Sequence, residues 1–463
     1  MACLCNPVSR WPFSHKRNSV RDMANFDDTT VPGEDFIDTL APAPPVAPPL
    51  DMRAHSDAPD RLLFFFSGFD PKSATFYHRL FRNGIAQRNA AHDETLALGK
   101  RHRIGRWASV WTSLWRGASS ALGGRPVNMR TRVHFMRWDD LVRRHWRRTP
   151  ATLARDYWNV YAGGLASGAL SRVWRAAPAA FWLAMFPLIV CAISFGAGLL
   201  IVGGLLSVAG WLSGVAATAV GAIAGALLWR VAARWVDCEW MLRLVAFMRQ
   251  QALGQVPALD ARLDEMAARL VEAVEARMRQ PGAAPLKEIM VVGYSSGSIL
   301  AASVLARSMP RLADVVDSRR TNKGTTLALV TLGQCIPIAA EWPDARRFRT
   351  ELEVLAESSS LTWHDYSATS DRAAFWRTPP WPQPALLRGR QASPPFKAAA
   401  GALQFAAMRR ERREMHLQYL RPPRGRGDAD SYDFFTLVCG PQTLAERHLQ
   451  GKTASDLRER AAA

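Results

Sequence analysis

A long run without a single Asp, Glu, Lys or Arg, residues 176–229, is the feature that most restricts how this 463-residue chain can fold. At about 1.5 Å per residue, one helix of that length would far exceed the roughly 30 Å hydrocarbon core of a bilayer, whereas two helices joined by a short turn would fit it. A turn suits residues 207–213, which begin and end in serine. The run therefore predicts a transmembrane hairpin with helices at about 179–204 and 210–229.

The alternative is a pair of helices buried in a large soluble core, but such a pair would normally carry a charged or strongly polar face. Arg172 and Arg175 precede the run and Arg230 and Arg234 follow it, whereas the turn has no charge. Cationic flanks favour the cytoplasmic side of a membrane. We therefore expect an integral protein of the cytoplasmic, or inner, membrane, with the remainder of the chain and both termini in the cytoplasm.

The charge balance indicates an anionic partner. The chain has 59 Lys and Arg against 40 Asp and Glu, a formal net charge of +19, and such an excess favours contact with phosphates. Basic segments at 143–150 and 409–414 would attract anionic headgroups beside a hairpin, although solvated helix faces are an equally good interpretation. Because no nucleic-acid reading motif is present, we predict a bilayer containing anionic lipids as the partner, and no nucleic acid.

The cysteines indicate no metal or disulfide framework, because all six are scattered without a repeated pair spacing. Cys3 and Cys5 are close enough to the N-terminus to be acylated, a possibility that the sequence leaves open. The first thirty residues contain no apolar run long enough for a signal peptide. The oligomeric state is not predicted.

Outside the hairpin, the chain divides by composition. A Pro-rich arm, residues 1–58, is predicted to be disordered. An α/β core is expected in two parts, residues 59–150 and 257–445, separated by the membrane insertion at 151–256 and followed by a polar tail, 446–463.

The pattern within the two core parts predicts a mostly parallel sheet. Uninterrupted apolar runs bounded by Gly or polar residues are typical of strands buried on both faces, and amphipathic stretches alternate with them. Strands are expected at 62–66, 130–140, 289–292, 325–337, 361–366 and 432–440, helices at 73–87, 231–253, 257–280 and 298–308, and either state at 103–115.

The pentapeptide Gly293-Tyr-Ser-Ser-Gly297 lies between the expected strand 289–292 and the expected helix 298–308. A nucleophile on so tight a turn needs small neighbours, because the reversal from strand to helix crowds its backbone, and its hydroxyl gains the positive end of the following helix. The pentapeptide alone arises often by chance, but in this context it makes Ser295 a candidate nucleophile.

At this point the chain resembles the α/β-hydrolase superfamily, and within it lipase- and esterase-like members, over roughly residues 60–140 and 257–440. The resemblance implies an α/β-hydrolase-like, mostly parallel sheet flanked by helices, with the hairpin inserted before the nucleophile strand. It also implies an oxyanion hole made by the backbone N–H of Ser296 and by the loop at Gly68 and Phe69. A plain turn is an equally good interpretation of that loop, which differs from the His-Gly-Gly type.

The resemblance further implies an acid and a histidine after the serine. Asp371, at the exit of the strand at 361–366, fits the acid better than Asp365, which is nearer the body of that strand, although either could cap a helix. His416, three residues before Tyr419, resembles the His-x-x-Tyr sequence of some lipase-like hydrolases and is preferred as the base.

Two other histidines follow the serine, His448 and His364. His448 remains an alternative base because the family's histidine usually follows the last core strand, whereas an expected strand at 432–440 comes after His416. His364 is more typical of a packed or solvent-facing side chain.

Together these features predict a membrane-tethered serine hydrolase that cleaves a lipid or other acyl ester through Ser295, His416 and Asp371, with no metal or organic cofactor. The alternative is a non-catalytic membrane scaffold with a hydrolase-like fold that binds anionic lipid or partner proteins. The sequence leaves open the substrate, and also the choice between hydrolysis and acyl transfer.

Overall fold

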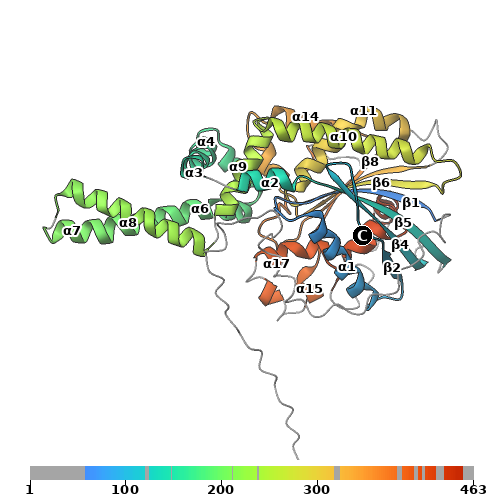
Figure 1. The fold of residues 1–463 in the computed structure, drawn as a ribbon, viewed down its shortest axis with the longest axis horizontal. Helices are drawn as coiled ribbons and strands as arrows, with labels where there is room; N and C mark the ends of the chain where they lie inside the picture. Colours follow the sequence, from blue (N-terminus) through green and yellow to red (C-terminus); the bar gives the residue numbers. More distant parts are fainter. Residues whose placement is uncertain are drawn as a thin grey trace, which may run out of the picture. The chain divides into compact units, whose positions relative to one another are not determined.

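The computed structural model describes residues 58–119, 125–146, 149–210, 212–236, 239–316, 324–382, 388–400, 405–408, 412–423 and 432–451. Within these ranges, nine strands form one mixed sheet flanked by helices, in the order β2-β4-β5-β1-β6-β7-β8-β9 with β3 paired to β4 (Figure 1). The expected α/β class and mostly parallel sheet are confirmed. The predicted disordered arm lies outside the described residues, and so do Cys3 and Cys5, whose acylation was left open, and residues 409–411 of the basic segment 409–414.

Strand β1 lies in the interior of the sheet, parallel to β5 on one side and to β6 on the other. From β6 onward each strand is parallel to the next, through β7 and β8 to β9. Every residue of β1 is buried, as its apolar run predicted. The parallel strands are β1 (Asp60–Phe66), β5 (Arg125–Met136), β6 (Leu286–Tyr294), β7 (Thr326–Leu332), β8 (Leu361–Tyr366) and β9 (Gly389–Ala392).

The other edge of the sheet is antiparallel. β4 (Ala108–Ser119) runs antiparallel to β5, and both β2 (Thr95–Leu98) and β3 (His102–Ile104) pair with β4. The segment 103–115, for which the sequence allowed strand or helix, therefore contributes to strands.

Two apolar cores lie on opposite faces of the sheet because successive side chains of a strand point to opposite sides. Leu62 and Phe64 pack with α10 (Pro257–Met278) and α11 (Gly297–Val316), whereas Leu63 and Phe65 pack with α1 (Ala74–Asn89). Figure 1 shows α10, α11 and α14 over one face and α1, α15 and α17 over the other. Further helices are α2 (Asp139–Trp146), α9 (Glu239–Ala252), α13 (Ile336–Ala340), α14 (Arg346–Glu357), α15 (Phe396–Ala400), α17 (Arg412–Leu417) and the 3₁₀ turn η6 (Gln418–Leu420).

The expected strand at 432–440 is wrong, because this segment forms helix α18 (Phe434–Cys439). The Asp433 side chain accepts a hydrogen bond from the backbone N–H of Phe435 at 2.9 Å, which caps the first turn. Phe434 and Phe435 are both fully buried and both contact Phe81 of α1. Successive side chains of a strand point to opposite faces, so two neighbouring residues that both contact α1 are typical of a helix and not of a strand.

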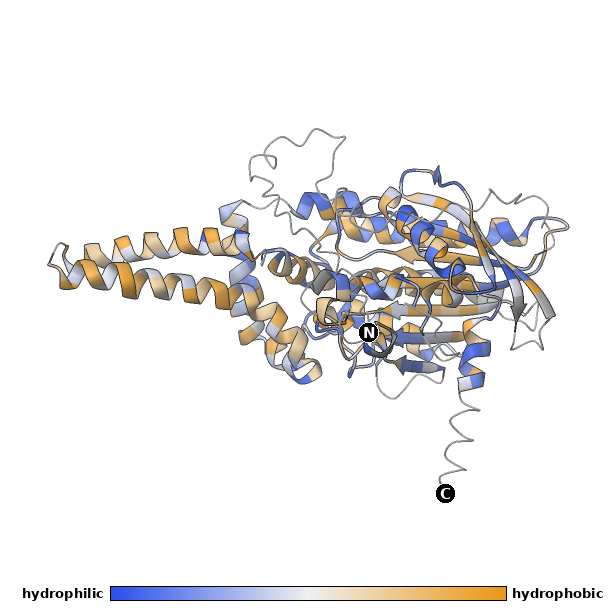
Figure 2. Ribbon diagram, turned by 90° about the horizontal axis from the view of Figure 1, so that it is seen from below, coloured by the Kyte–Doolittle hydropathy of each residue, from blue (hydrophilic) through white to orange (hydrophobic). Residues whose placement is uncertain are grey.

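Two long apolar helices extend from the body of the protein (Figures 1 and 2). The first spans Pro178–Val208, made of α6 (Pro178–Ala197), the π-turn η5 (Gly198–Gly203) and α7 (Gly204–Val208), and the second is α8 (Gly214–Trp235). Only 17% of the most apolar window of each helix is buried, which is unlike the core helices of a soluble protein. Both helices are long and apolar enough to cross a membrane.

Glycines let the two apolar helices approach closely. A side chain at Gly198 would collide with the backbone of Gly225, and one at Gly221 would lie 3.0 Å from the Gly198 carbonyl oxygen. Close contact through small residues is typical of helices that pack in a bilayer. The expected continuous helix at 231–253 is instead divided, since α8 ends at Trp235 and α9 begins at Glu239.

Four short elements connect α2 to the first apolar helix and pack beside its base. They are α3 (Pro150–Tyr157), the π-turn η4 (Trp158–Ala162), α4 (Gly163–Ala166) and α5 (Ala169–Ala176).

Candidate active site

Ser295 occupies the turn between β6 and α11 in a left-handed backbone conformation, with φ of 58°. Among the described residues it is the one residue other than glycine with positive φ. A left-handed conformation costs a residue with a Cβ roughly 1–2 kcal/mol. A side chain at Gly297 would collide with the Phe66 carbonyl oxygen, so the glycine after the two serines is sterically required. Such local strain concentrates at functional sites.

Hydrogen bonds fix the Ser295 turn on both sides. The Ser295 N–H donates to the Leu332 carbonyl oxygen at 2.8 Å, and the Ser295 carbonyl accepts from the N–H of Ser298 at 3.0 Å. Ser295 is partly exposed, whereas its neighbours Tyr294 and Ser296 are buried. The turn therefore presents the Ser295 hydroxyl at the N-terminal end of α11, where free backbone N–H groups favour negative charge.

His416 and Asp371, which are 45 residues apart in the chain, are hydrogen-bonded through His416 Nδ1 and Asp371 Oδ2 at 2.7 Å. Asp371 lies in the loop after β8 and is 3% exposed, and His416 lies on α17 with a side chain that is 17% exposed. Since a carboxylate accepts at Nδ1, that nitrogen carries the proton and Nε2 is left as the acceptor. The sequence prediction paired the same two residues.

The His416 imidazole lies next to the peptide that holds the serine. A side chain at Gly333, directly after Leu332, would lie 3.0 Å from His416 Cε1, and the His416 and Tyr294 rings have centroids 5.1 Å apart. Gly333 also has a positive φ of 54°. The His416–Asp371 pair therefore lies near the Ser295 turn, at the carboxyl ends of β6, β7 and β8, the edge where open α/β sheets place their ligands.

Tyr419 supports the acid. Its hydroxyl accepts a hydrogen bond from the Ala368 N–H at 2.7 Å, in the loop that carries Asp371. Burial, with the nearby Asp371 charge, raises the pKa of Tyr419 well above its usual value, so the hydroxyl keeps its proton. Tyr419 therefore holds the loop of Asp371 in place, and the His-x-x-Tyr spacing brings histidine and tyrosine to the same loop.

The alternative acid, Asp365, is not in this group. It is fully buried in β8 and accepts hydrogen bonds from Thr331 Oγ1 at 2.8 Å, Gln391 Nε2 at 2.9 Å and Ser367 Oγ at 3.2 Å. Burial raises the pKa of Asp365 to about 7 despite these hydrogen bonds, which lower it. The arrangement ties β8 to β7 and β9.

The alternative histidines contact each other instead. His364 Nε2 and His448 Nδ1 are 3.1 Å apart, and both side chains are buried. Burial lowers the pKa of His364 to about 3, with a further contribution from the charge of His448. His364 is therefore a packed side chain, as its alternation along the strand indicated, and its ring bonds to His448 and not to the Asp371 pair.

The loop predicted to form the oxyanion hole lies against the serine. A side chain at Gly68 would lie 3.0 Å from Ser295 Cβ and 3.4 Å from Ser295 Oγ, so only glycine allows this approach. The Phe69 N–H, however, donates to Ser296 Oγ at 2.6 Å. The Ser296 side chain was not considered in the sequence prediction, which used only its backbone N–H. The second serine of Gly-Tyr-Ser-Ser-Gly was the sequence feature that could have indicated this hydrogen bond.

An aromatic cluster covers this loop on the side of the apolar helices. The Phe69 ring has centroid distances of 5.1 Å to Phe247, 5.8 Å to Trp146 and 6.2 Å to Trp138. Phe247 belongs to α9, which follows α8 directly, and the Trp138 indole N–H donates to the Ser67 carbonyl at 3.0 Å. The loop beside Ser295 is therefore packed against the helix that leads out of the apolar hairpin.

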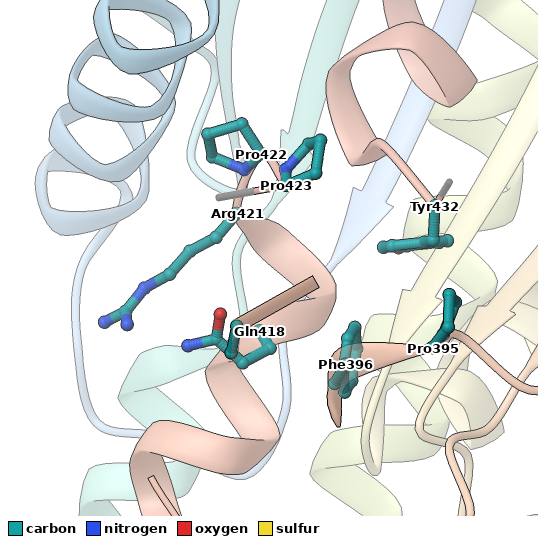
Figure 3. A pocket seen from close by; sticks show the side chains of 8 residues that line it. Pro395, Phe396, Gln418, Arg421, Pro422, Pro423 and Tyr432 are labelled. Carbon is teal, nitrogen blue, oxygen red and sulfur yellow. The ribbon is translucent and has the colours of Figure 1, made fainter. Parts of the chain in front are cut away.

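Neither of two cavities in the described part of the chain is lined by Ser295, His416 or Asp371. One, of about 20 Å³, has Gln418 and Arg421 in its wall, and Figure 3 shows Phe396 beside Pro395 and Tyr432 in the same wall. It has room for about one water molecule. The other, of about 150 Å³, lies between α9, α10, α11 and α14, where Arg307 pairs with Asp260 and Glu351.

Among the residues that the structure describes, no group of three or more His, Cys, Asp and Glu side chains could hold a metal ion. What the arrangement offers is a strained serine, a histidine whose Nε2 can accept a proton and a buried carboxylate. No family model, curated protein or solved structure matches this chain.

Proposed function

We propose that this protein is a membrane-tethered serine hydrolase of the α/β-hydrolase type that cleaves a lipid or other acyl ester. The observation that carries the proposal is the hydrogen bond of His416 to Asp371 beside the left-handed Ser295 turn. The three residues come from separate parts of the chain, and each has the type and local geometry that nucleophilic acyl transfer requires.

In the proposed reaction, His416 Nε2 accepts the proton of the Ser295 hydroxyl as Oγ attacks the acyl carbon. Asp371 holds the Nδ1 proton in place and stabilises the imidazolium that forms. The imidazolium then donates its proton to the leaving alcohol, and a water molecule deprotonated by His416 releases the acid from the acyl-enzyme. No metal or organic cofactor has a role in these steps.

The negative charge of the tetrahedral intermediate would be stabilised at the N-terminal end of α11. The backbone N–H groups of Ser296 and Gly297 lie in the first turn, where no helix carbonyl precedes them. The Phe69 N–H already donates to Ser296 Oγ, so in this proposal the donors are the N–H groups of the Ser295 turn, and the Gly68–Phe69 loop forms a wall of the oxyanion hole.

The order of elements along the chain also supports the hydrolase type. Because residues 432–440 include helix α18, His416 follows β9, the last strand along the described chain. The departure from the family pattern in the place of the histidine depended on a strand at 432–440.

A lipid substrate is the most economical choice because the candidate site and the apolar hairpin are packed together. Phe69 and Phe247 belong to the same apolar core as Ala180 and Ala184 at the base of α6. An acyl chain that leaves a bilayer along the hairpin would reach an aromatic cluster next to Ser295. In this proposal the hairpin spans the cytoplasmic membrane and the α/β body lies on the cytoplasmic side.

Labelling of the intact protein in membranes with a fluorophosphonate probe tests the proposal. Wild type is expected to react and Ser295→Ala is not, while Ser308→Ala serves as a matched control on the same helix, since its hydroxyl bonds within the helix to the Val304 carbonyl. Equal labelling of wild type and Ser295→Ala rejects Ser295 as nucleophile.

Absence of labelling in the wild type would favour the scaffold alternative. In that case, binding of anionic liposomes should survive Ser295→Ala and should weaken as salt is added, because screening reduces the attraction of basic segments to headgroups.

A further inference from the structure

The segment from α3 to α5, residues 150–176, has apolar side chains on two sides. One side packs into the core of the protein, and the side that faces outward also carries large apolar residues. Trp158 is 73% exposed and Leu165 is 76% exposed, and Trp174 is also exposed. Exposed Trp and Leu on a helical segment that already has a buried side need a second apolar environment. The opposite, buried side belongs to the main core and consists of Leu153, Val160, Tyr161, Ala169 and Val173.

Two hydrogen bonds attach the segment to the first apolar helix, near the N-terminal end of that helix. The Tyr161 hydroxyl donates to the Ala184 carbonyl at 2.9 Å, and the Tyr157 hydroxyl donates to the Pro187 carbonyl at 3.2 Å. These carbonyls are six and nine residues beyond Pro178, where the helix begins. At a helical rise of about 1.5 Å per residue, they lie about 9 Å and about 14 Å along the helix axis. The segment therefore lies alongside the first part of the span.

The charge around the segment is almost entirely positive. Residues 141–235 contain nine arginines and one acidic residue, Asp156, which is buried. Arg155 and Arg175 are exposed within the segment itself, and Arg230 and Arg234 are exposed near the end of α8. Basic residues beside exposed Trp and Leu are the composition of helices that lie in the headgroup region of an anionic bilayer.

We propose that residues 150–176 form an interfacial anchor that lies in the leaflet nearest the α/β body, with Trp158 and Leu165 at the boundary of the acyl chains. The occupant of this surface is the bilayer, because the surface is continuous with the apolar hairpin, lies beside the first part of α6 and is flanked by exposed arginines. The inference rests on the proposed membrane insertion of the hairpin but not on the proposed reaction.

The anchor would fix the height of the candidate active site above the membrane. α2 ends at Trp146, shortly before α3, and Trp146 packs on Phe69 beside Ser295. α9, which carries Phe247, packs in the same core as Val160 and Tyr161 of the anchor. Hairpin and anchor together would prevent the body from tilting, so that the aromatic cluster stays at the membrane surface.

Site-directed fluorescence in lipid nanodiscs tests the anchor. Full-length protein is prepared with the substitutions Cys3→Ser, Cys5→Ser, Cys191→Ala and Cys238→Ala, which leave only the buried Cys335 and Cys439. An environment-sensitive dye is attached at Trp158→Cys or Leu165→Cys, and separately at Ile223→Cys in the hairpin and Glu272→Cys on the solvated side of α10. The nanodiscs contain phosphatidylcholine, phosphatidylglycerol and lipids brominated on the acyl chains.

The anchor predicts that dye at positions 158 and 165 is blue-shifted and loses intensity with brominated lipid, as at position 223, and is protected from aqueous iodide. Position 272 should show the reverse. If 223 is quenched by lipid while 158 and 165 behave like 272, the anchor is overturned and the hairpin stands. If 223 is not quenched either, the membrane hairpin itself fails. If dye at position 158 is quenched neither by brominated lipid nor by iodide, and copies of the protein crosslink, the surface is a contact between copies of this chain. That result also overturns the anchor.

Discussion

His416 Nδ1 and Asp371 Oδ2 are 2.7 Å apart, and this contact joins a helix near the C-terminus to the loop after β8. Tyr419, three residues after His416, accepts a hydrogen bond from the Ala368 amide in the loop that carries Asp371. The loop of the acid is thus tied to the same helical segment as the imidazole. Because Nδ1 of His416 is held by Asp371, the imidazole exchanges protons through Nε2, which is directed away from the carboxylate.

The first prediction follows from this contact. Asp371→Asn should keep the fold but lower the rate of ester hydrolysis by about 10⁴-fold, because an amide favours the wrong tautomer of His416. Hydrolysis of a chromogenic short-chain ester by protein in detergent measures the effect. Asp365→Asn is the matched control, since Asp365 lies on β8, just before the Asp371 loop, and its hydrogen bonds are to Thr331, Ser367 and Gln391. Equal losses in the two variants would contradict the assignment of the acid.

The second prediction concerns the Ser296 hydroxyl. In Ser296→Ala the Phe69 N–H loses its partner at 2.6 Å. A buried donor left unpaired costs about 1–3 kcal/mol. Because this bond holds the Gly68–Phe69 loop against the Ser295 turn, its loss should displace the wall of the proposed oxyanion hole, and kcat should fall about 10- to 100-fold with little change in KM. Ser308→Ala, a buried serine further along α11, should leave kcat unchanged. A rise in KM alone would show that Ser296 acts on substrate binding.

The third prediction separates steric effects on the site from those on the fold. Gly68→Ala adds a methyl group 3.4 Å from Ser295 Oγ, so fluorophosphonate labelling should slow markedly while the thermal unfolding midpoint changes little. Gly297→Ala should instead prevent folding, because its methyl group would collide with the backbone of β1 at Phe66. Gly196→Ala, with open space around it, is the neutral control. Unaltered labelling of Gly68→Ala would remove this loop from the site.

The sequence predicted the elements whose patterns are local. The buried strand at 62–66, the amphipathic helix at 257–280 and the strand, turn and helix around Ser295 are all present within a few residues of the expected bounds. Each is determined by its own apolar period and by nearby Gly or Pro. The long uncharged run likewise gave two apolar helices.

What the sequence missed depends on contacts between distant residues. The run at 432–440 is rich in strand-forming residues, yet it is a helix because Phe434 and Phe435 both fit against α1. Tertiary packing thus overrides local propensity. In the same way, the hydrogen bond from Phe69 to Ser296 joins residues 227 apart, and no local pattern contains it.

The fourth prediction is a pH dependence of stability. Burial raises the pKa of Asp365 to about 7 from its ordinary 3.8, so between these pH values the folded protein holds a proton that the unfolded chain has released. The contribution of Asp365 is therefore fully present below about pH 4 and is lost as pH rises through 7. His134 and His364, whose pKa values burial lowers to about 4 and about 3, act in the opposite direction, since only the unfolded chain is protonated near pH 5.

Asp365→Asn isolates the carboxyl from these histidines. The difference in thermal midpoint between wild type and Asp365→Asn should favour wild type more at pH 5 than at pH 8, because the amide cannot ionise. Midpoints measured in the same detergent at both pH values provide the test. A difference that does not change with pH would mean that Asp365 has the same charge in the folded and unfolded chain.

The buried pair of Arg61 and Glu288 supplies the last prediction. Arg61 Nε and Glu288 Oε2 are 2.6 Å apart, and neither side chain is exposed. Arg61 also donates to the carbonyls of Val438 and Gly440 at 3.0 and 2.8 Å. The pair connects β1 and β6 to the end of α18, and so joins distant parts of the chain.

Removing one partner leaves the other charge buried without compensation, which typically costs about 3–5 kcal/mol. Arg61→Met and Glu288→Leu should each lower the free energy of unfolding by about that amount, whereas the double variant should lose less than the sum because no charge is left unpaired. Arg269→Met breaks the exposed pair with Glu272. This control should change stability by less than about 1 kcal/mol. Urea unfolding of the detergent-solubilised protein measures all four, and strict additivity in the double variant would show that the two residues act independently.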